Sequence, residues 1–435
     1  MILGTKLFRQ FYPLVKATNC NLFGQYFISR RIQRECIHSL MSSIDEIKTK
    51  LKKNWYQFVN TNSKKFSNKV IDGSSPPSIF VGEFGYPHVR IGPMIPPYHG
   101  DTSILDRPEL WSGKSLEQIV NYRINLLKGT MIHNVNKISG RYIESLQDMA
   151  LSKRVVESTM TFEKIPSQYL NEMTLTKDDS EEIPTIFSAP VSEIKILPST
   201  ADQKIEKKYY DYDSYASDAV VELYENSIDM TRISKVLSMG MLGRKKNRKL
   251  VPTKWSITAA DDIVSLYLLN RIKDNAILDN YLVFAFNHLA NYYSVIFIPD
   301  DVWYFEMIES WIDTNGRVHI GSDYESGKKI DHYPSIAGAY FAARLAAAEY
   351  LFKKRKKASV LILREIHPEY FVSLGVWQIR EGLRECLRSK GRNFESFDSA
   401  LKYGVSKTSL SKNEWIKNSS IIKNNKQKRI SDYLD

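Results

Sequence analysis

The sequence predicts a mixed α/β (α+β) protein that folds as one large domain or two closely packed domains and ends in a flexible C-terminal tail. The chain has 435 residues, and 43% of them are hydrophobic, which is enough to bury a large core. Stretches with helical apolar spacing alternate with short apolar runs typical of strands, and the chain has no internal repeat. The run from Ser409 to Lys426 is rich in Ser, Asn and Lys and has little to bury, so we expect a mobile tether there.

The first half of the chain changes character near Gly73. Residues 1–65 alternate apolar positions with Lys and Arg at helical spacing, which predicts an N-terminal helical segment over residues 1–70. After Gly73, frequent Pro and Gly favour short strands joined by tight turns. Ser115 and Gln118 have the spacing of a capping box and predict a helix through Leu127. Residues 163–207 are rich in Pro and predict a loop or an irregular β segment.

The second half predicts an alternation of helices and strands. The Ala-rich centre of 336–354 makes this the clearest helix, and the apolar run 359–366 reads as a buried strand. The other expected elements are helices over 214–226, 231–239, 257–271 and 377–388, and strands over 281–286 and 294–298.

Composition argues against several classes of protein. The sequence has neither an 18-residue apolar window nor a signal-peptide pattern, so we expect no membrane insertion or secretion. Its three cysteines, Cys20, Cys36 and Cys386, are too scattered for a disulfide framework, which fits a reducing cytoplasm. No paired Cys-x-x-Cys ligands occur, so we expect no metal site, and no cofactor is indicated.

The positive charge is concentrated in two blocks. The net charge is +12, and the blocks cover residues 244–249 and 353–357. Such blocks neutralise phosphates and release counterions, so we expect a polyanionic partner, DNA above all. A solvated surface explains either block alone equally well. The first block supplies the candidate nucleic-acid contacts Lys245, Lys246, Arg248 and Lys249.

Residues 249–262 form the densest group of polar side chains. If Ser256 is the N-cap of the following helix, the free N–H groups there, with Lys254 nearby, form a plausible phosphate seat. Thr258 and Asp262 then share a face, whereas Asp261 is turned about 100° away, so the two carboxylates are not expected to work as a pair. The alternative is a simple cap with a buried structural acid.

A second group, Arg364, Glu365 and His367, follows the predicted strand 359–366. Ligand groups gather at strand ends in α/β sheets, and these three residues could bind phosphate and move a proton. Alternation places Arg364 on one side of the strand and Glu365 with His367 on the other. Catalysis by Asp262, Glu365 and His367 is therefore one hypothesis, and a purely structural pairing of the arginine and glutamate is the other.

Familiar nucleotide and hydrolase motifs are missing from the sequence. Gly82, Gly85 and Gly92 surround Arg90, a further candidate phosphate ligand, but their spacing is not that of a dinucleotide fingerprint. A Walker A motif, a His-Glu-x-x-His motif and a Gly-x-Ser-x-Gly motif are also absent. Any enzymatic activity, directed at a phosphodiester or a nucleotide, therefore stays an open possibility.

The last nine residues resemble the interaction motif of the sliding clamp (PCNA), Q-x-x-h-x-x-a-a. Gln427, Ile430 and Tyr433 match it, and Leu434 replaces the more usual second aromatic residue. In a 3₁₀ turn, positions i and i+3 lie on one side, so Ile430 and Tyr433 would form one apolar wedge with Leu434 beside them. The motif predicts weak, reversible recruitment to the clamp.

Many strings between residues 75 and 390 resemble the archaeal Nre family of DNA repair proteins. They include 75–82, 91–93, 100–103, 248–258 with 261–262, 342–345, 363–368 and 375–377. The resemblance implies two family domains, over residues 71–290 and 291–408, and a tail, 409–435, that ends in the clamp motif. Many members carry an N-terminal cysteine-rich zinc motif, but only Cys20 and Cys36 lie in that region here, so zinc is not carried over.

The leading hypothesis is a DNA damage repair factor that is recruited to the clamp and whose body binds DNA or a nucleotide-like ligand, in an archaeal cytoplasm. The competing hypothesis is a non-catalytic DNA-binding adaptor in which the same polar residues hold the fold. An RNA-directed factor is a third possibility.

Overall fold

The computed structural model describes residues 61, 64–168, 186–313, 316–370, 372 and 374–426. All of them belong to one unit of the chain, Lys50–Asp435. The predicted helical segment over residues 1–70 therefore lies almost wholly outside the described residues, as do Cys20, Cys36 and the clamp motif. Within the described part, the mixed α/β class is confirmed.

The first of two six-stranded sheets contains the short strands expected after Gly73. Its order is β1-β5-β6-β4-β3-β2, with β4 and β6 parallel and the other neighbours antiparallel. Gly92 on β3 lies so close to Gly129 on β4 that a Cβ atom at residue 92 would be 1.7 Å from the Gly129 carbonyl oxygen. Only glycine permits this approach. The strands are β1 (Val70–Ser75), β2 (Ile79–Val81), β3 (His88–Ile95), β4 (Leu127–Asn134), β5 (Val156–Phe162) and β6 (Phe187–Ile196).

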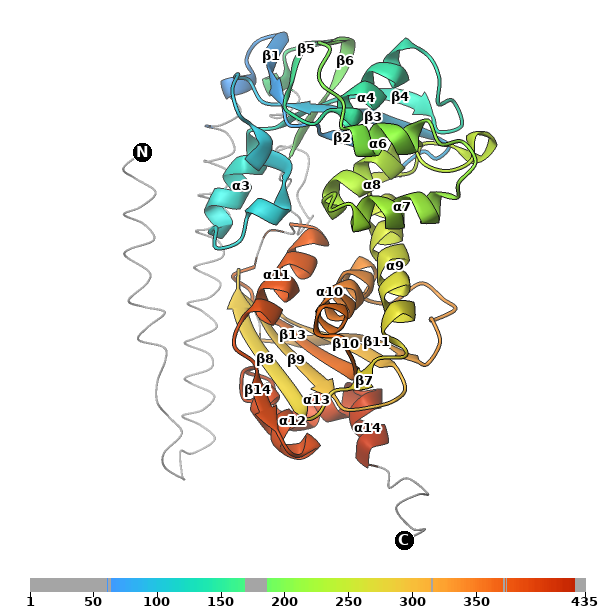
Figure 1. The fold of residues 1–435 in the computed structure, drawn as a ribbon. Helices are drawn as coiled ribbons and strands as arrows, with labels where there is room; N and C mark the ends of the chain where they lie inside the picture. The colour runs from blue at the N-terminus through green and yellow to red at the C-terminus, as the bar shows by residue number, and fades with distance from the viewer. Residues whose placement is uncertain are drawn as a thin grey trace. The chain divides into compact units, whose positions relative to one another are not determined.

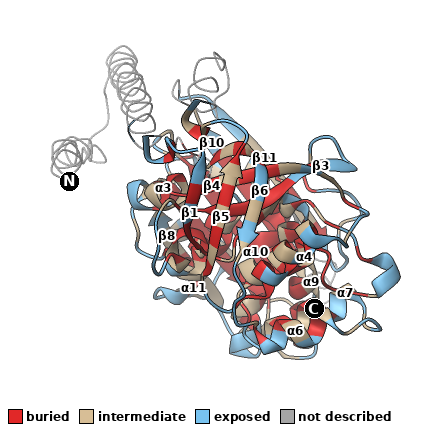
Figure 2. Ribbon diagram, turned by 90° about the horizontal axis from the view of Figure 1, so that it is seen from above, coloured by how far each residue is buried: buried red, intermediate tan, exposed pale blue. Residues whose placement is uncertain are grey.

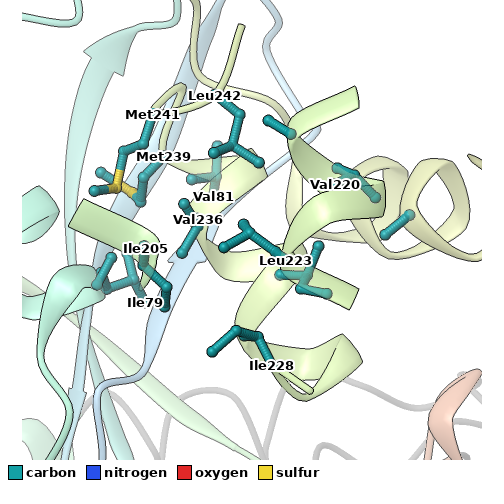
Figure 3. Close-up of a cluster of buried hydrophobic side chains, with 14 of the residues drawn as sticks. Ile79, Val81, Ile205, Val220, Leu223, Ile228, Val236, Met239, Met241 and Leu242 are labelled. Carbon is teal, nitrogen blue, oxygen red and sulfur yellow. The ribbon is translucent and has the colours of Figure 1, made fainter. Parts of the chain in front are cut away.

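Helices cover one face of this sheet and share a hydrophobic core with it. Figure 3 shows Ile79 and Val81 of β2 beside Val220 and Leu223 of α7 and Val236 of α8. Figure 2 shows that the outward turns of α6 and α7 stay exposed, as expected for amphipathic helices. The helices of this layer are α4 (Arg141–Leu151), α6 (Gln203–Tyr209), α7 (Ala216–Glu225), α8 (Met230–Ser238) and α9 (Thr253–Ile272).

Helix α3 (Leu116–Ile124) begins as its sequence predicts but ends earlier. Both hydrogen bonds of the capping box between Ser115 and Gln118 are present. The helix stops at Ile124 instead of continuing to Leu127, because Leu127 is the first residue of β4 and pairs with Phe187 of β6. Sheet pairing therefore overrides the helical pattern at this end.

The second sheet has the order β11-β10-β13-β9-β8-β14, with the predicted strand β13 (Ser359–Ile366) in its middle. All eight residues of β13 are buried, because both faces of the sheet are covered. Val360 and Ile362 face the helices α10 (Gly338–Lys354) and α11 (Trp377–Arg388), whereas Leu361 and Leu363 face the C-terminal helices. The other strands are β8 (Tyr281–His288), β9 (Asn291–Ile298), β10 (Tyr304–Ile312), β11 (Val318–Ser326) and β14 (Arg392–Phe394).

The domain boundary predicted between residues 290 and 291 lies between two paired strands of the second sheet. It falls in the turn of a hairpin, where Leu289 and Ala290 have positive φ angles and β8 pairs with β9 over seven residue pairs. Helix α9 also contributes residues to the core of the first sheet and to the core of the second (Figure 1). A hairpin and a shared helix make a division at this point physically unfavourable.

The prediction of a mobile tether over residues 409–426 is wrong. This stretch forms α13 (Lys412–Asn418) and α14 (Ser420–Lys426), which together with α12 (Phe397–Val405) cover the second face of the second sheet. Trp415, Ile421 and Ile422 are buried there. The burial of these three apolar side chains is enough to order a stretch whose composition is otherwise polar. The prediction of a tether considered only the overall composition.

We predict that Trp415→Ala lowers the free energy of unfolding by about 3 to 5 kcal/mol. Trp415 is fully buried, and its Nε1 donates to Thr408 Oγ1 at 3.0 Å. Urea denaturation measures the change, and Lys417→Ala, at a side chain that is 72% exposed in the same helix, is the matched control. Equal stability of the two variants would contradict the packing of residues 409–426 on the sheet and would support a mobile tether.

Candidate functional site

The start of α9 differs from the predicted phosphate seat. The helix begins at Thr253, so the prediction that Ser256 is its N-cap is wrong. Pro252 stands before the first turn, where the missing N–H of proline costs nothing. Ser256 is fully buried and donates to the Thr253 carbonyl oxygen at 2.9 Å, and Thr258 donates to the Lys254 carbonyl oxygen at 3.2 Å. Their predicted role in phosphate binding therefore loses its geometric basis.

Lys254, the predicted cation of this seat, and Arg90, the separate candidate phosphate ligand of the glycine-rich turn, both lie at the surface. The ammonium group of Lys254 is 3.4 Å from Glu83 Oε1, and Trp255 donates from Nε1 to Glu83 Oε2 at 3.1 Å. The Trp255 ring also packs beside Tyr86, with 5.6 Å between ring centroids. Because Glu83 offsets the charge of Lys254, this surface is a poorer phosphate site than the sequence suggests.

The adjacent aspartates of α9 point to different partners, as predicted. Asp261 is fully buried and accepts from Arg380 Nη1 at 2.7 Å. Asp262 pairs with Arg344, which is itself fully buried, and with Lys329 at 2.5 Å. The two carboxylates thus belong to separate ion pairs, as their predicted orientation on the helix implies.

The charge balance around Asp262 is dominated by Arg344. Its guanidinium group donates to Asp262, to Glu325 Oε2 at 3.0 Å and to Ser265 Oγ at 3.1 Å. Burial acts to lower the pKa of Arg344, but the carboxylates of Glu325 and Asp262 raise the pKa above its ordinary value. The arginine is therefore a permanent cation, and Asp262 is one of its two counterions.

Strand β13 separates Arg364 from Glu365 and His367, as the alternation predicts. Arg364 pairs with Glu309, and its guanidinium group also donates to Asn291 Oδ1 at 2.9 and 2.6 Å and to Gln378 Oε1 at 3.0 Å. Burial disfavours the charge, but Tyr293 and Glu309 more than offset this effect, so the pKa of Arg364 is raised. Every one of these partners belongs to the protein interior.

Glu365 holds the start of the C-terminal segment. The Ser409 N–H donates to both carboxylate oxygens, at 2.9 and 3.0 Å, and the Leu410 N–H donates to Oε2 at 2.9 Å. His367 Nε2 is 2.7 Å from Oε1. Burial acts to raise the pKa of Glu365, but the contacts with His367 and the two N–H groups lower it. Glu365 is thus a charged anchor for residues 409 and 410.

The two predicted groups do not form one site. Their hydrogen bonds reach different residues of α11: Arg380 donates to Asp261, and Gln378 accepts from Arg364. In the described residues, Asp262 pairs with Arg344 and Lys329, whereas Glu365 and His367 contact each other. The structure also shows, in the part of the chain that it describes, no group of three or more His, Cys, Asp or Glu that could hold a metal ion.

The basic block 244–249 divides into a buried arginine and exposed lysines. Arg248 is 8% exposed and donates to the carbonyl oxygens of Gly243, Tyr209 and Asp211 at 2.7, 2.7 and 2.9 Å, so its predicted role as a direct nucleic-acid contact is wrong. Its guanidinium group satisfies three carbonyl oxygens instead, which fixes it in the interior. Lys245, Lys246 and Lys249 remain exposed, as a contact with DNA would require.

Arg248 joins this block to a tyrosine-rich loop, and together they form what we call the tyrosine–basic surface, residues 209–215 and 244–249. The Arg244 guanidinium carbon is 4.0 Å from the ring centroid of Tyr215, and the Lys245 ammonium nitrogen is 5.3 Å from that of Tyr212. Tyr210, Tyr212 and Tyr215 are 60%, 39% and 55% exposed. The sequence contained the signal, four tyrosines in seven residues, but only the fold brings them to the basic block.

Within the described residues, no helix is long and apolar enough to cross a membrane. The predicted clamp contacts Gln427, Ile430, Tyr433 and Leu434 lie outside the described residues.

Comparisons with known proteins agree along nearly the whole described chain. Residues 48–315 match the family profile described as "Archaeal Nre, N-terminal", and residues 325–433 match "Archaeal Nre, C-terminal". The chain is 35% identical over 368 residues to the DNA repair protein NreB of Archaeoglobus fulgidus, covering 83% of this chain and 91% of that protein. It is 36% identical to NreA of the same organism over 78% of this chain and 85% of the relative.

A more distant relative is the DNA repair protein NreA of Haloferax volcanii, which is 29% identical over 76% of this chain and 81% of its own length. No solved structure matches the chain.

We predict that Glu365→Ala lowers the free energy of unfolding by about 3 kcal/mol or more, because it leaves buried N–H groups at residues 409 and 410 without their acceptor. Chemical denaturation measures the loss, and His367→Ala, at a partly exposed ring, is the milder control. A variant that keeps its stability but loses repair activity would instead support a catalytic Glu365.

For Glu365→Gln, the same denaturation experiment should show a loss of stability that depends on pH. Since the pKa of Glu365 is lowered from its ordinary value of 4.5, its contribution is complete above that pH and is lost as the pH falls through the lowered value. The stability difference between wild type and this variant should shrink with acidification, and a difference that is constant with pH would contradict the assignment.

Proposed function

Since this chain belongs to the archaeal Nre family, whose relatives are named as DNA repair proteins, we propose that it is a DNA repair factor whose body binds DNA and whose C-terminus binds the sliding clamp. Its place of action is then the cytoplasm, where archaeal DNA lies. The tyrosine–basic surface is the single observation that supports this proposal most.

The surface has the two features that single-stranded nucleic acid requires. Exposed lysines, Lys245 and Lys246, can neutralise phosphates, and exposed rings, Tyr210 and Tyr215, can stack with bases. A duplex hides the base faces, so stacking favours an unpaired strand. The surface therefore suits single-stranded DNA better than an intact duplex.

Internal contacts hold this surface in place before any ligand arrives. Arg248, in the second segment, donates to the carbonyl oxygens of Tyr209 and Asp211 in the first. The Asp211 carboxylate accepts from the Ser214 and Asp213 N–H groups at 3.2 and 3.3 Å. These hydrogen bonds, with Lys208 at 3.2 Å, lower the pKa of Asp211 to about 2. Lys208 pairs with this carboxylate and with Glu222, so it is not free to bind phosphate, whereas Lys245 and Lys246 are exposed.

The enzymatic version of the hypothesis receives less support from the geometry. Asp262 is a counterion of Arg344, and Glu365 is an anchor for residues 409 and 410. A structural role therefore accounts for both carboxylates without any catalytic function. We propose the non-catalytic adaptor as the better description of these two residues.

Clamp recruitment rests on the spacing of Gln427, Ile430, Tyr433 and Leu434. The structure changes what precedes this motif. Glu306 on β10 accepts from the Ser420 and Ile421 N–H groups at 2.7 and 3.0 Å and from Ser419 Oγ at 2.6 Å, which fixes the start of α14 on the sheet. In the sequence the motif directly follows this docked helix. We propose that the clamp, when bound to the motif, lies close to the body of the protein.

We predict that Lys245→Ala with Lys246→Ala weakens binding to single-stranded DNA and lowers the slope of log affinity against log salt by about 1.4, or 0.7 for each lost phosphate contact. Fluorescence anisotropy at several salt concentrations measures both effects. The matched control is Lys402→Ala with Lys417→Ala, which removes the same charge from exposed positions elsewhere. An equal slope change in the two pairs would contradict a specific surface.

Tyr215→Ala should cost about 1 to 3 kcal/mol of binding free energy through lost stacking, without changing the salt slope. Tyr333→Ala, at a ring that is 61% exposed outside the surface, is its control. The same measurement with RNA of identical sequence separates the RNA-directed alternative, which requires the RNA to bind more tightly than the DNA.

Removal of residues 427–435 should abolish binding to the clamp and leave the thermal unfolding temperature unchanged, because the truncation keeps α13 and α14 intact. Surface plasmon resonance with immobilised clamp and differential scanning calorimetry measure the two properties. Retained clamp affinity in the truncated protein would exclude the motif as the binding element.

A further inference from the structure

A cavity of about 560 Å³ lies where the α7–α8 junction, α9, the end of α10 and α11 meet. Its rim includes the exposed residues Glu225, Ser227 and Phe352, and its deeper wall includes the buried Leu268 and Met230. The volume falls within the range of small-molecule sites. No part of it belongs to the tyrosine–basic surface.

One buried carboxylate oxygen in this cavity lacks a partner. Glu109, which ends the 3₁₀ helix Pro108–Leu110, accepts from the Thr231 N–H through Oε1 at 3.1 Å. Its Oε2 is buried and has no hydrogen-bond partner among the described residues. Burial acts to raise the pKa of Glu109, but the charge of Arg380 and the bond from Thr231 lower it, so the group is a carboxylate at neutral pH. A buried acceptor left open is costly unless a ligand fills it.

The cations near Glu109 are already paired. Arg384 donates to Glu349 at 2.8 and 2.6 Å and to Glu381 at 2.8 Å. Arg107, whose partner is Asp229 at 2.7 Å, adds no free charge either. The cavity is therefore acidic, which disfavours a phosphate group inside it and favours a ligand that donates hydrogen bonds.

The walls of the cavity add a requirement for a flat, partly apolar ligand. The rings of Tyr224, Tyr267 and Phe352 line it together with the apolar side chains of Leu268 and Met230. A polyamine is flexible and strongly hydrated, and it would leave these surfaces unfilled. A heteroaromatic ring with an amino group meets both conditions, because its faces stack and its edge donates.

The junction that forms the rim is conformationally unusual. Ser227 has a φ angle of 61°, in the left-handed region that non-glycine residues seldom occupy. It ends α7 in a Schellman-type cap, in which the Ile228 N–H donates to the Leu223 carbonyl oxygen at 3.0 Å. Here the left-handed residue turns the chain between α7 and α8 so that Glu225 and Asp229 both face the cavity.

We propose that this cavity binds a nucleobase that carries an exocyclic amino group, with that group donating to Glu109 Oε2 and the ring held among Tyr224, Tyr267 and Phe352. The base can come from a free nucleoside or from a nucleotide taken out of a DNA strand. Helix α7 connects this cavity, at Tyr224, with the tyrosine–basic surface, at Tyr215, over a length of about 15 Å. The inference goes beyond DNA binding by that surface and does not require it.

The test is calorimetric titration of the full chain with adenosine and with purine riboside, which is the same nucleoside without the amino group. Adenosine should bind at least about tenfold more tightly, the effect of one hydrogen bond to a charged group. Glu109→Gln, which keeps an acceptor for Thr231, should remove this difference, whereas Glu117→Gln, at an exposed helical position, should preserve it. Phe352→Ala, at a rim residue that is 39% exposed, should weaken both nucleosides.

A single-stranded oligonucleotide that contains 2-aminopurine distinguishes the two sources of the base, a DNA strand and a free nucleoside. A fluorescence increase that Glu109→Gln abolishes identifies a base taken from the strand, and adenosine binding without this increase identifies a free nucleoside. Equal affinity for adenosine and purine riboside, no effect of Glu109→Gln, or tighter binding of spermidine than of adenosine would overturn the proposal. Tyr215→Ala should leave adenosine binding unchanged, so failure of the tyrosine–basic surface and failure of this cavity are distinguishable.

Discussion

The two adjacent aspartates of α9 are the constraint on which the rest of the structure depends. Asp261 binds Arg380 on α11, and Asp262 binds Arg344 on α10, so one helix holds both helices that cover the second sheet. The same helix packs its Val264 and Leu268 into the core of the first sheet. Buried charges without partners are costly, so these pairs tolerate few alternative arrangements of the two sheets.

Buried carboxylates also fix the C-terminal end of the folded body. Glu365 and Glu306 lie on neighbouring strands and bind the N–H groups that begin the segment of α13 and the helix α14. The carboxylates that the sequence suggested as catalytic residues therefore connect secondary-structure elements. The better candidates for function are the tyrosine–basic surface, whose rings are exposed, and the cavity with Glu109, whose Oε2 has no partner among the described residues.

Local patterns predicted the regular elements well and the roles of polar side chains poorly. The strand 359–366 and the helix 377–388 have the predicted bounds, because apolar periodicity is a local signal. The predicted N-cap at Ser256 is wrong, since Pro252 is the N-cap and the helix begins at Thr253. The predicted tether over 409–426 is wrong, since its few apolar residues pack against a sheet far away in sequence. The cavity could not be predicted at all, because five separate segments supply its walls.

Hydrogen–deuterium exchange of the full chain with and without single-stranded DNA tests the central claim most directly, because it locates the binding surface without any substitution. The account predicts that DNA slows exchange in residues 209–215 and 244–249. Protection of residues 253–262 and 363–368 instead, with no change in the tyrosine–basic surface, would contradict it and would restore the strand end and the start of α9 as the nucleic-acid site.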